Sequence, residues 1–230
     1  MTPDPARRVL VTGAARGIGR AVADALTDHE LVLTVRRPED VARLETELPG
    51  ARVLLLDLAD APAIAERVAG VEVDAVVHCA GVEGVAPAAE LDPARLAAVV
   101  AANLAGPVEL TRLLLPGLRR RGGHVVFVSS TAVLGAFPGW AAYAASKAAL
   151  RAYADTLRVE EPGVRVTSVL PGRTDTGMQR RIHAQAGRDF DPATAMAAAS
   201  VAAAIRAVLT APGDVEVPEL VLTPFTHPGG

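Results

Sequence analysis

Two residues in the stretch 130–147 have the types and spacing needed for proton transfer, Tyr143 and Lys147. They stand four positions apart, and on a helix this spacing puts both side chains on one face, one turn from each other. A free tyrosine has a pKa of about 10 and is a poor base at neutral pH. A nearby ammonium favours the phenolate and lowers that pKa. The pair is therefore predicted to exchange a proton near neutral pH, as interconversion of a carbonyl and an alcohol requires.

A serine follows the strand that is expected before this helix. Val125–Val128 is an apolar run typical of a buried strand, and Ser129 and Ser130 come after it. A hydroxyl at the carboxyl end of such a strand can reach into a crevice and hydrogen-bond a carbonyl oxygen. Taken alone, Tyr-x-x-x-Lys also fits a surface pair on an ordinary helix, so the segments upstream decide between these interpretations.

A glycine-rich segment, Thr12–Gly19, lies directly after the first expected strand, residues 8–12. Its glycines are spaced Gly-x-x-x-Gly-x-Gly, and a helix is expected from Gly17 to His29. A strand, a glycine turn and a helix N-terminus together form an anion site, because backbone N–H groups and the helix dipole face the phosphates. The alternative is a tight strand–helix turn without a ligand.

In this order, over roughly residues 8–176, the motifs resemble the short-chain dehydrogenase/reductase family. The resemblance implies an α/β fold, a Rossmann-type doubly wound parallel sheet of seven strands in the order 3-2-1-4-5-6-7, as a three-layer α/β/α structure. It also implies one NAD(P)-binding domain over residues 1–230. Ser130, thirteen positions before Tyr143, would hold the substrate oxygen. Tyr143 would be the acid/base, and Lys147 would also bind the nicotinamide ribose.

The composition agrees with one such domain. The chain has 230 residues, of which 50% are hydrophobic and 3% aromatic, and apolar strands alternating with alanine-rich helices suit a parallel sheet covered on both faces. A net charge of −3 does not suggest a nucleic-acid partner. A single cysteine, Cys79, excludes an internal disulfide and fits a reducing compartment. Without an apolar leader, a long apolar run or a metal-ligand cluster, we expect a cytoplasmic protein with no membrane partner and no metal.

The resemblance further implies a cofactor site along the carboxyl ends of the strands. Asp57 would lie beside the adenine ring; its alternative role, as the cap of helix 60–69, suits Asp60 better. Ala80 and Gly81 would let the cofactor lie against the backbone. The complete set of expected cofactor contacts is Gly13, Arg16, Gly17, Ile18, Gly19, Arg36, Asp57, Leu58, Ala80, Gly81, Tyr143, Lys147, Pro171, Gly172, Thr174 and Thr176.

The end of the second expected strand, residues 31–35, predicts which cofactor is preferred. Many dinucleotide folds place a carboxylate there to bind the ribose hydroxyls of NAD, but this chain has Val35 followed by Arg36. Arg16, in the glycine loop, lies on the same side. Two guanidiniums suit a 2′-phosphate, so NADP(H) is predicted and NAD is less favoured. The alternative for Arg36 is a solvated loop charge.

A long helix is expected over residues 93–121, with Asn103 near its middle. Gly106-Pro107 should break its hydrogen-bond ladder, because proline lacks an N–H, and the freed carbonyls could hold a water next to Lys147. By resemblance Asn103 is the fourth catalytic residue, part of a proton relay. The alternative is a polar side chain that satisfies its own kinked helix.

Where the family usually has an asparagine this chain has Cys79, which we interpret as a buried strand residue rather than a nucleophile. His78 is interpreted as a core residue. Asp191-Pro192 is expected to cap the last helix, which ends near Leu209, and residues 215–222 to form an edge strand.

The expected substrate pocket is apolar. Residues 177–190 should form a mobile substrate lid. Ordinary packing is the alternative for the pocket residues that precede Tyr143. The expected lining residues are Leu134, Phe137, Trp140 and Met178.

The sequence thus predicts an NADP(H)-dependent oxidoreductase that transfers hydride between the nicotinamide and a carbonyl or alcohol substrate, of ketoreductase or alcohol dehydrogenase type. A homo-oligomer, dimer or tetramer, is expected through the two long alanine-rich helices. Two other functions stay open. A dinucleotide-binding regulatory protein would not need the Ser/Tyr/Lys/Asn set, and an epimerase or dehydratase with the same dyad usually carries a longer C-terminal substrate domain.

Overall fold

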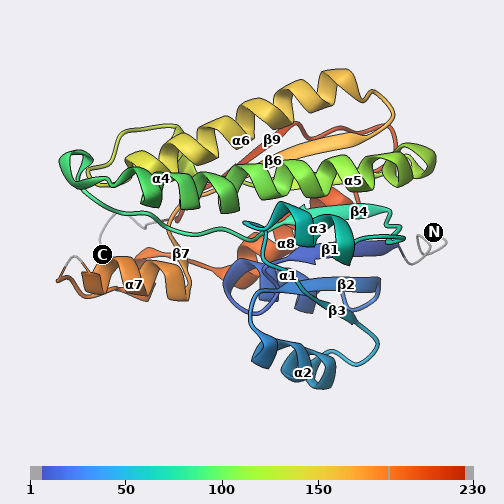
Figure 1. Cartoon of the computed structure of the whole chain (residues 1–230), viewed down its shortest axis with the longest axis horizontal. Helices are drawn as coiled ribbons and strands as arrows, with labels where there is room; N and C mark the ends of the chain where they lie inside the picture. The colour runs from blue at the N-terminus through green and yellow to red at the C-terminus, as the bar shows by residue number, and fades with distance from the viewer. Residues whose placement is uncertain (1–6, 186, 226–230) are drawn as a thin grey trace.

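The computed structural model describes residues 7–185 and 187–225 (Figure 1). Within them one parallel sheet has the strand order β3-β2-β1-β4-β5-β6-β9, and all six neighbouring pairs are parallel. The order reverses between β1 and β4, as in a doubly wound sheet, so the predicted fold is confirmed. The strands are β1 (Arg8–Thr12), β2 (Glu30–Val35), β3 (Arg52–Leu55), β4 (Ala75–His78), β5 (His124–Val128), β6 (Arg165–Pro171) and β9 (Glu219–Leu222).

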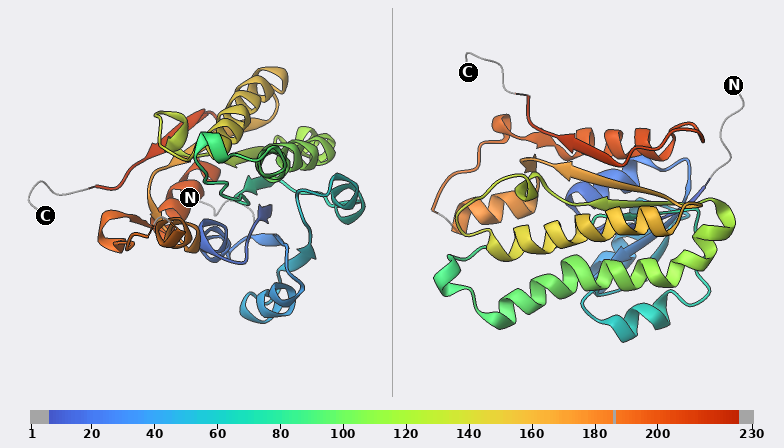
Figure 2. Two further views of the ribbon diagram at one scale, coloured as in Figure 1. Left: turned by 60° about the vertical axis from the view of Figure 1, so that its left-hand side comes forward. Right: turned by 90° about the horizontal axis from the view of Figure 1, so that it is seen from above.

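Helices cover both faces of the sheet (Figure 2). One layer contains α1, α2 and α8, and the other contains α3, α5 and α6. Helix α7, in the segment where a substrate lid is predicted, lies beyond the carboxyl end of the sheet (Figure 1). The helices are α1 (Gly17–Ala25), α2 (Pro38–Glu47), α3 (Ala61–Arg67), α4 (Pro93–Val100), α5 (Gly106–Arg121), α6 (Ala141–Glu160), α7 (Gly177–Gln185) and α8 (Ala198–Leu209).

Alternation along the strands builds a separate core on each face. In β1, Val9 and Val11 pack with α1 and α8, whereas Leu10, between them, packs on the α3–α5 side. In β5, Val126 belongs to the first core and Phe127 to the second. Both side-chain faces are buried, because successive side chains of a strand point to opposite sides. This explains why the strands are continuously apolar.

The long helix 93–121 continues through the expected break. Pro107 has no N–H for the carbonyl of Asn103, four residues earlier, and the ladder passes through a π-helical turn, Ala101–Ala105, before it resumes in α5. The prediction of a disturbed ladder is confirmed, but the helix is not interrupted. Its 29 residues are long and apolar enough to cross a membrane by length and composition; buried residues of α5, such as Leu110 and Leu114, pack in the sheet core, as in the core helix of a globular domain.

The segment after β6 differs from the prediction. Asp191 caps a short 3₁₀ turn, Pro192–Thr194, instead of the last helix, and β8 (Met196–Ala197) follows, paired with β7 (Thr174–Asp175). The last helix begins only at Ala198. The edge strand is shorter than expected: β9 starts at Glu219, directly after Pro218, which has no N–H to donate to the ladder. Residues 226–230 lie outside the described part of the chain.

Candidate active site

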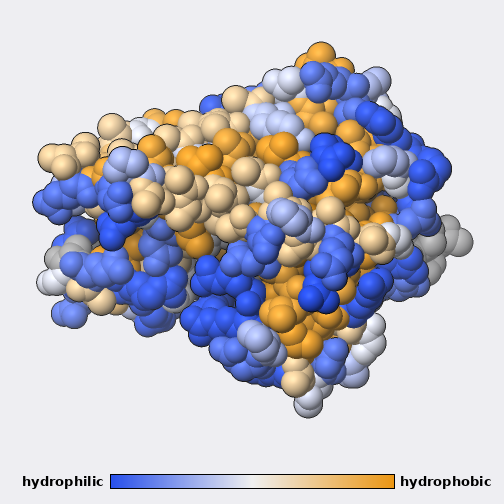
Figure 3. All heavy atoms as spheres, viewed as in Figure 1, coloured by the Kyte–Doolittle hydropathy of each residue, from blue (hydrophilic) through white to orange (hydrophobic). Residues whose placement is uncertain are grey.

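One large pocket, about 1390 Å³, opens outside the carboxyl ends of the strands. It extends from the glycine loop, past the ends of β2 and β4, to Tyr143 and the inner side of α7. In the space-filling view the molecule is hollowed between α7 and the α2 side, and hydrophilic residues lie on both sides of the hollow (Figure 3). The residues predicted for the site line this pocket, with two exceptions: Asn103 is fully buried, and Leu134 is exposed to solvent.

The glycine loop and the end of β4 are held in close contact. Gly13 has a φ of 67°, and a Cβ there would lie 2.9 Å from the Cα of Ala80. Thr12 Oγ1 accepts a hydrogen bond from Ala80 N at 3.0 Å. Only glycine fits this combination of conformation and approach. The pocket floor is therefore backbone, which a flat ligand can approach closely.

The N-terminus of α1 is not satisfied by a side chain. Its N-cap residue, Arg16, is extended and makes no side-chain cap, and the first turn contains no acidic residue. By contrast, Asp60 caps α3 through Ala63 N, and Asp92 caps α4. Exposed amides at a helix start, together with the helix dipole, favour an anion.

Arg16 and Arg36 are both exposed at this end of the pocket. In the described part of the chain neither forms an ion pair or a side-chain hydrogen bond, although most of the chain's arginines do. Val35 lines the pocket at the end of β2, as the sequence indicates. Asp57 and Leu58 line it after β3, and Asp57 accepts from Ala59 N rather than capping α3.

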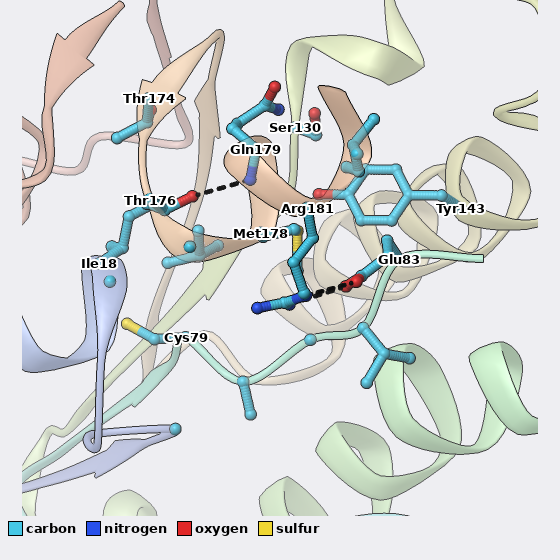
Figure 4. Close-up of a pocket in the computed structure, with 18 of the residues that line it drawn as sticks. Ile18, Cys79, Glu83, Ser130, Tyr143, Thr174, Thr176, Met178, Gln179 and Arg181 are labelled. Carbon is cyan, nitrogen blue, oxygen red and sulfur yellow. Dashed lines mark hydrogen bonds and ion pairs between the residues drawn. The ribbon is translucent and has the colours of Figure 1, made fainter. Parts of the chain in front are cut away.

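At the other end of the pocket lie Ser130 and Tyr143 (Figure 4), and Lys147 lines the same pocket. Lys147 is the only lysine in the chain, and its Nζ lies 5.9 Å from the centroid of the Tyr143 ring. Ser130 Oγ accepts from Ala132 N at 3.1 Å. The competing serine, Ser129, donates to the backbone oxygen of Lys147 at 3.2 Å and so fixes the strand to α6.

Burial disfavours the charged form of both ionisable groups. It raises the pKa of Tyr143, opposed by the hydrogen bond with Ser130. It lowers the pKa of Lys147 to about 8. The sequence predicted that Lys147 lowers the tyrosine pKa, but in this structure desolvation raises that pKa, and Lys147 Nζ donates instead to Val128 O at 2.8 Å. Tyr143 is therefore a neutral phenol, suited to donate a proton.

Asn103 is fully buried in the π-helical turn and reaches across to the loop after β4. Its Oδ1 accepts from Val82 N at 2.8 Å, and its Nδ2 donates to Val82 O at 2.9 Å and to Ser146 Oγ at 3.1 Å. A Cβ on Gly81 would lie 3.3 Å from Asn103 Oδ1 and 3.4 Å from Lys147 Nζ. The side chain therefore ties this loop to α6 instead of satisfying its own helix.

Neither Cys79 nor His78 is placed to take part in catalysis. Cys79 follows β4 and is half-buried at the pocket, so it is less enclosed than the sequence indicated; burial raises the pKa of its thiol to about 12, so it is not a nucleophile. His78 is a core residue, stacked on Phe127 and hydrogen-bonded to Thr111. In the described residues no group of three His, Cys, Asp or Glu side chains could hold a metal ion.

Sequence reasoning missed an ion pair that crosses the pocket. Arg181, on α7, forms two hydrogen bonds with Glu83, on the loop after β4, at 3.0 and 3.3 Å (Figure 4). Burial opposes ionisation of Glu83, but the hydrogen bonds from Arg181, a backbone hydrogen bond and the charges of Arg181 and Arg36 together lower the carboxyl pKa. At the start of α7, Thr176 Oγ1 accepts from Gln179 N. Glu83 and Arg181 are 98 positions apart, and no local pattern signals their contact.

The predicted substrate residues are only partly brought together. Phe137, Trp140 and Met178 line the pocket, and Trp140 packs edge-to-face on Tyr143 at 5.4 Å. Leu134 does not: it follows the 3₁₀ turn after Ser130 and points to solvent, 54% exposed. The pocket is also more polar than expected, because α7 and its neighbours contribute charged and amide groups, namely Glu83, Arg95, Gln179, Arg181, His183, Gln185 and Arg188.

A doubly wound parallel sheet with an uncapped helix after its first glycine loop, and a pocket at the switch point, defines a nucleotide-binding protein of the Rossmann class. Residues 7–187 match the family model described as short chain dehydrogenase. The chain is 30% identical to the NADP-dependent 3-hydroxy acid dehydrogenase YdfG of Salmonella typhi, over 95% of each chain. The chain belongs to the short-chain dehydrogenase/reductase family, a family of oxidoreductases, as the motifs indicated.

Two solved structures are similar along nearly the whole chain. An alcohol dehydrogenase from the archaeon Thermococcus sibiricus, complexed with 5-hydroxy-NADP, has a TM-score of 0.86 and 29% identity, and the match covers 96% of this chain and 98% of that one. The closed form of a serine dehydrogenase complexed with NADP+ has a TM-score of 0.89 and 29% identity, covering 96% and 97%. The similarity therefore includes both the sheet and the segments around the pocket.

Proposed function

We propose that this protein is an NADP(H)-dependent oxidoreductase that interconverts a carbonyl and an alcohol. The observation that carries the proposal is the continuity of the pocket, which joins the glycine loop to the buried Tyr143 hydroxyl and Lys147 amine. Dinucleotide and substrate can thus meet at one place. Two of the similar proteins are described as complexed with 5-hydroxy-NADP or NADP+, and a third as NADP-dependent.

The residues present fit an NADP(H) molecule. The uncapped start of α1 offers backbone N–H groups to a pyrophosphate, and the floor at Gly13 and Ala80 is bare backbone. Arg16 and Arg36 suit the 2′-phosphate, since two unpaired guanidiniums can bind phosphate oxygens with charge-assisted hydrogen bonds. When bound, the nicotinamide supplies or accepts the hydride. Thr174 and Thr176, after β6, complete the set on the lid side.

Each catalytic side chain has a role that its surroundings support. Ser130 orients the substrate oxygen, and Tyr143, a neutral phenol, donates the proton to that oxygen in the reducing direction. Lys147, whose pKa is lowered by burial, binds the ribose hydroxyls and favours the phenolate that remains after proton transfer. Asn103 holds the loop beside Lys147, and backbone carbonyls freed at the π-helical turn would hold the relay water.

The two other functions have less support. A regulatory binding protein would not need the phenol, hydroxyl and amine of Tyr143, Ser130 and Lys147 to line one pocket. An epimerase or dehydratase would use the same dyad, but such relatives usually carry a longer C-terminal substrate domain. Mixing the protein with NADPH and a panel of carbonyl compounds, and following the loss of nicotinamide absorbance, separates all three.

Cofactor choice gives a sharper test. We expect NADPH to be preferred over NADH by on the order of 30–150-fold in kcat/KM, the factor for about 2–3 kcal/mol at a solvent-accessible phosphate site. Replacing Val35 with Asp and Arg36 with Gln should reverse the preference, because the carboxylate repels the 2′-phosphate and accepts from the ribose hydroxyl. A wild-type preference for NADH would refute the role of Arg36 and leave the family unchanged.

The remaining proposals concern the whole protein: one NAD(P)-binding domain over residues 1–230, a substrate lid over residues 177–190 and a cytoplasmic homo-oligomer. The surface over α4 is largely hydrophobic, whereas that over α7 is hydrophilic (Figure 3). Leu96 on α4 is 37% exposed, which supports an interface through α4, α5 and α6. Light scattering after size exclusion on the wild type and on Leu96→Glu gives the oligomeric state.

A further inference from the structure

Asp40 is an acidic residue that lines the same pocket as the exposed Arg16 and Arg36. It lies in the first turn of α2, its side chain is only 13% exposed, and it lines the pocket together with Ala15, Arg16 and Arg36. An uncompensated carboxylate there would repel a phosphate on the ribose 2′ position and would accept a hydrogen bond from a 2′-hydroxyl. It would also compete with the phosphate for the two unpaired arginines. Taken by itself, Asp40 would favour NAD(H).

Arg43, one turn further along α2, compensates this carboxylate. Its Nη2 lies 2.6 Å from Asp40 Oδ1, and the same nitrogen donates to the backbone oxygen of Ala15 at 3.0 Å. Its Nη1 donates to Glu47 Oε2 at 3.2 Å. One guanidinium thus ties the carboxylate and the glycine loop together. Because Asp40 is mostly buried and Arg43 only 40% exposed, the pair is less screened than an ordinary surface ion pair.

We infer that Arg43 is a specificity-determining residue of the cofactor site, through Asp40. By neutralising that carboxylate it leaves the positive charge of Arg16 and Arg36 available, and the site then selects NADP(H) over NAD(H). Arg43 does not line the pocket, so it acts as a positioning residue and not by contact with the cofactor. The inference rests on the proposed function, since it assumes that the 2′-phosphate binds at this end.

The test measures dissociation constants for NADPH and NADH on the full chain, by fluorescence titration, for the wild type, Arg43→Gln, Asp40→Asn and the double variant. Arg43→Gln should lower the preference for NADPH by about tenfold, the factor for one charge interaction of about 1.4 kcal/mol. The double variant should regain most of the wild-type preference, because the freed carboxylate is gone. The ratio of the two constants is the readout, so a general loss of binding does not imitate the effect.

Two further variants separate charge from structure. Arg43→Lys keeps the cation beside Asp40 and should retain most of the NADPH preference. Arg20→Gln is the matched control. Arg20, on α1, also pairs with Glu47 but has no ion pair with Asp40, so the ratio of the two dissociation constants should equal that of the wild type. Thermal unfolding of each variant shows that it is folded.

Several outcomes would overturn the inference. If Arg43→Gln keeps the wild-type ratio within about twofold, Arg43 only anchors α2 to the glycine loop. If the double variant has the same ratio as Arg43→Gln, the carboxylate is not the cause. If Arg43→Gln does not fold, the other two variants decide. The inference is refuted if Asp40→Asn has a lower preference for NADPH than the wild type, or if Arg43→Lys loses that preference. If the wild type binds neither dinucleotide, the proposed function fails with it, whereas the other outcomes leave that function standing.

Discussion

Burial has opposite consequences for the two ionisable groups at the reacting end of the pocket. It raises the pKa of Tyr143 and lowers that of Lys147 to about 8, so both move toward their neutral forms. A neutral phenol beside a weakened cation suits proton donation to a carbonyl oxygen. The free protein is therefore prepared for the reducing direction, and the phenolate is formed only when the proton has been given up.

Tyr143→Phe should lower kcat by ~10²–10⁴-fold, because the proton donor is removed while the ring still packs against Trp140. NADPH affinity should hardly change. The chain's other tyrosine provides the control: Tyr153 packs edge-to-face on Phe127 in the core, and Tyr153→Phe should keep nearly full activity. If Tyr143→Phe kept more than about a third of the wild-type rate, the phenol would not be the acid.

Lys147 should make stability depend on pH in a specific way. Its pKa falls from 10.5 to about 8 on folding, which corresponds to a cost of about 3 kcal/mol below pH 8. Between these values the unfolded chain holds the lysine proton and the folded chain does not, so the contribution of Lys147 to the free energy of unfolding should rise with pH through this window. Lys147→Met should lack that rise. Urea unfolding of both proteins between about pH 7 and pH 10 measures it, and parallel curves would contradict the assigned pKa.

At the scale of elements, α7 is held over the pocket from two sides. Thr176 Oγ1 accepts from Gln179 N at its start, and Arg181 pairs with Glu83 across the opening. Glu83 itself is placed by Asn103, which fixes the neighbouring Val82 through two hydrogen bonds. The π-helical turn therefore affects the lid as well as Lys147.

Reversing the charges of the Glu83–Arg181 pair tests this link. Glu83→Arg and Arg181→Glu, made singly, each place like charges opposite one another and should speed NADPH release by about three- to tenfold. The double exchange should restore most of the wild-type rate, measured by stopped-flow displacement. Arg180→Glu, whose native partner is Asp175 on the same side, is the control. If the single variants release NADPH at the wild-type rate, α7 does not close the pocket.

Local patterns predicted the strands, the glycine loop and the Tyr–Lys pair, because continuous apolar runs and fixed spacings are properties of short segments. The start of β1 at Arg8 and the end of β2 at Val35 agree with the structure. Contacts between distant segments were not predictable: Arg181 meets Glu83, and Arg43 reaches the carbonyl of Ala15. The wrong start of the last helix has a similar cause, since β8 exists only by pairing with β7.

For the whole molecule, both cores depend on neutral histidines. His78 and His124 are buried, each with one ring nitrogen bonded to a threonine, and burial lowers the pKa of each from 6.5 to about 3. Below pH 6.5 the unfolded chain binds more protons, so the free energy of unfolding should decrease as the pH is lowered, by about 2 kcal/mol for each histidine at pH 5. His78→Gln and His124→Gln should each remove one such share, as urea unfolding at about pH 7.5 and pH 5 would show.

The burial of Lys147 also makes it possible to measure the fraction of chains whose pocket is unoccupied. Because this is the only lysine, an amine-acylating reagent has two targets per chain, the α-amino group and a side chain reached through the pocket. With a pKa of about 8, the side chain is a competent nucleophile near neutral pH. Intact-mass spectra should show a second acyl group in the empty protein and its loss with saturating NADPH. The fraction of doubly acylated chains then reports vacancy directly, without a known substrate.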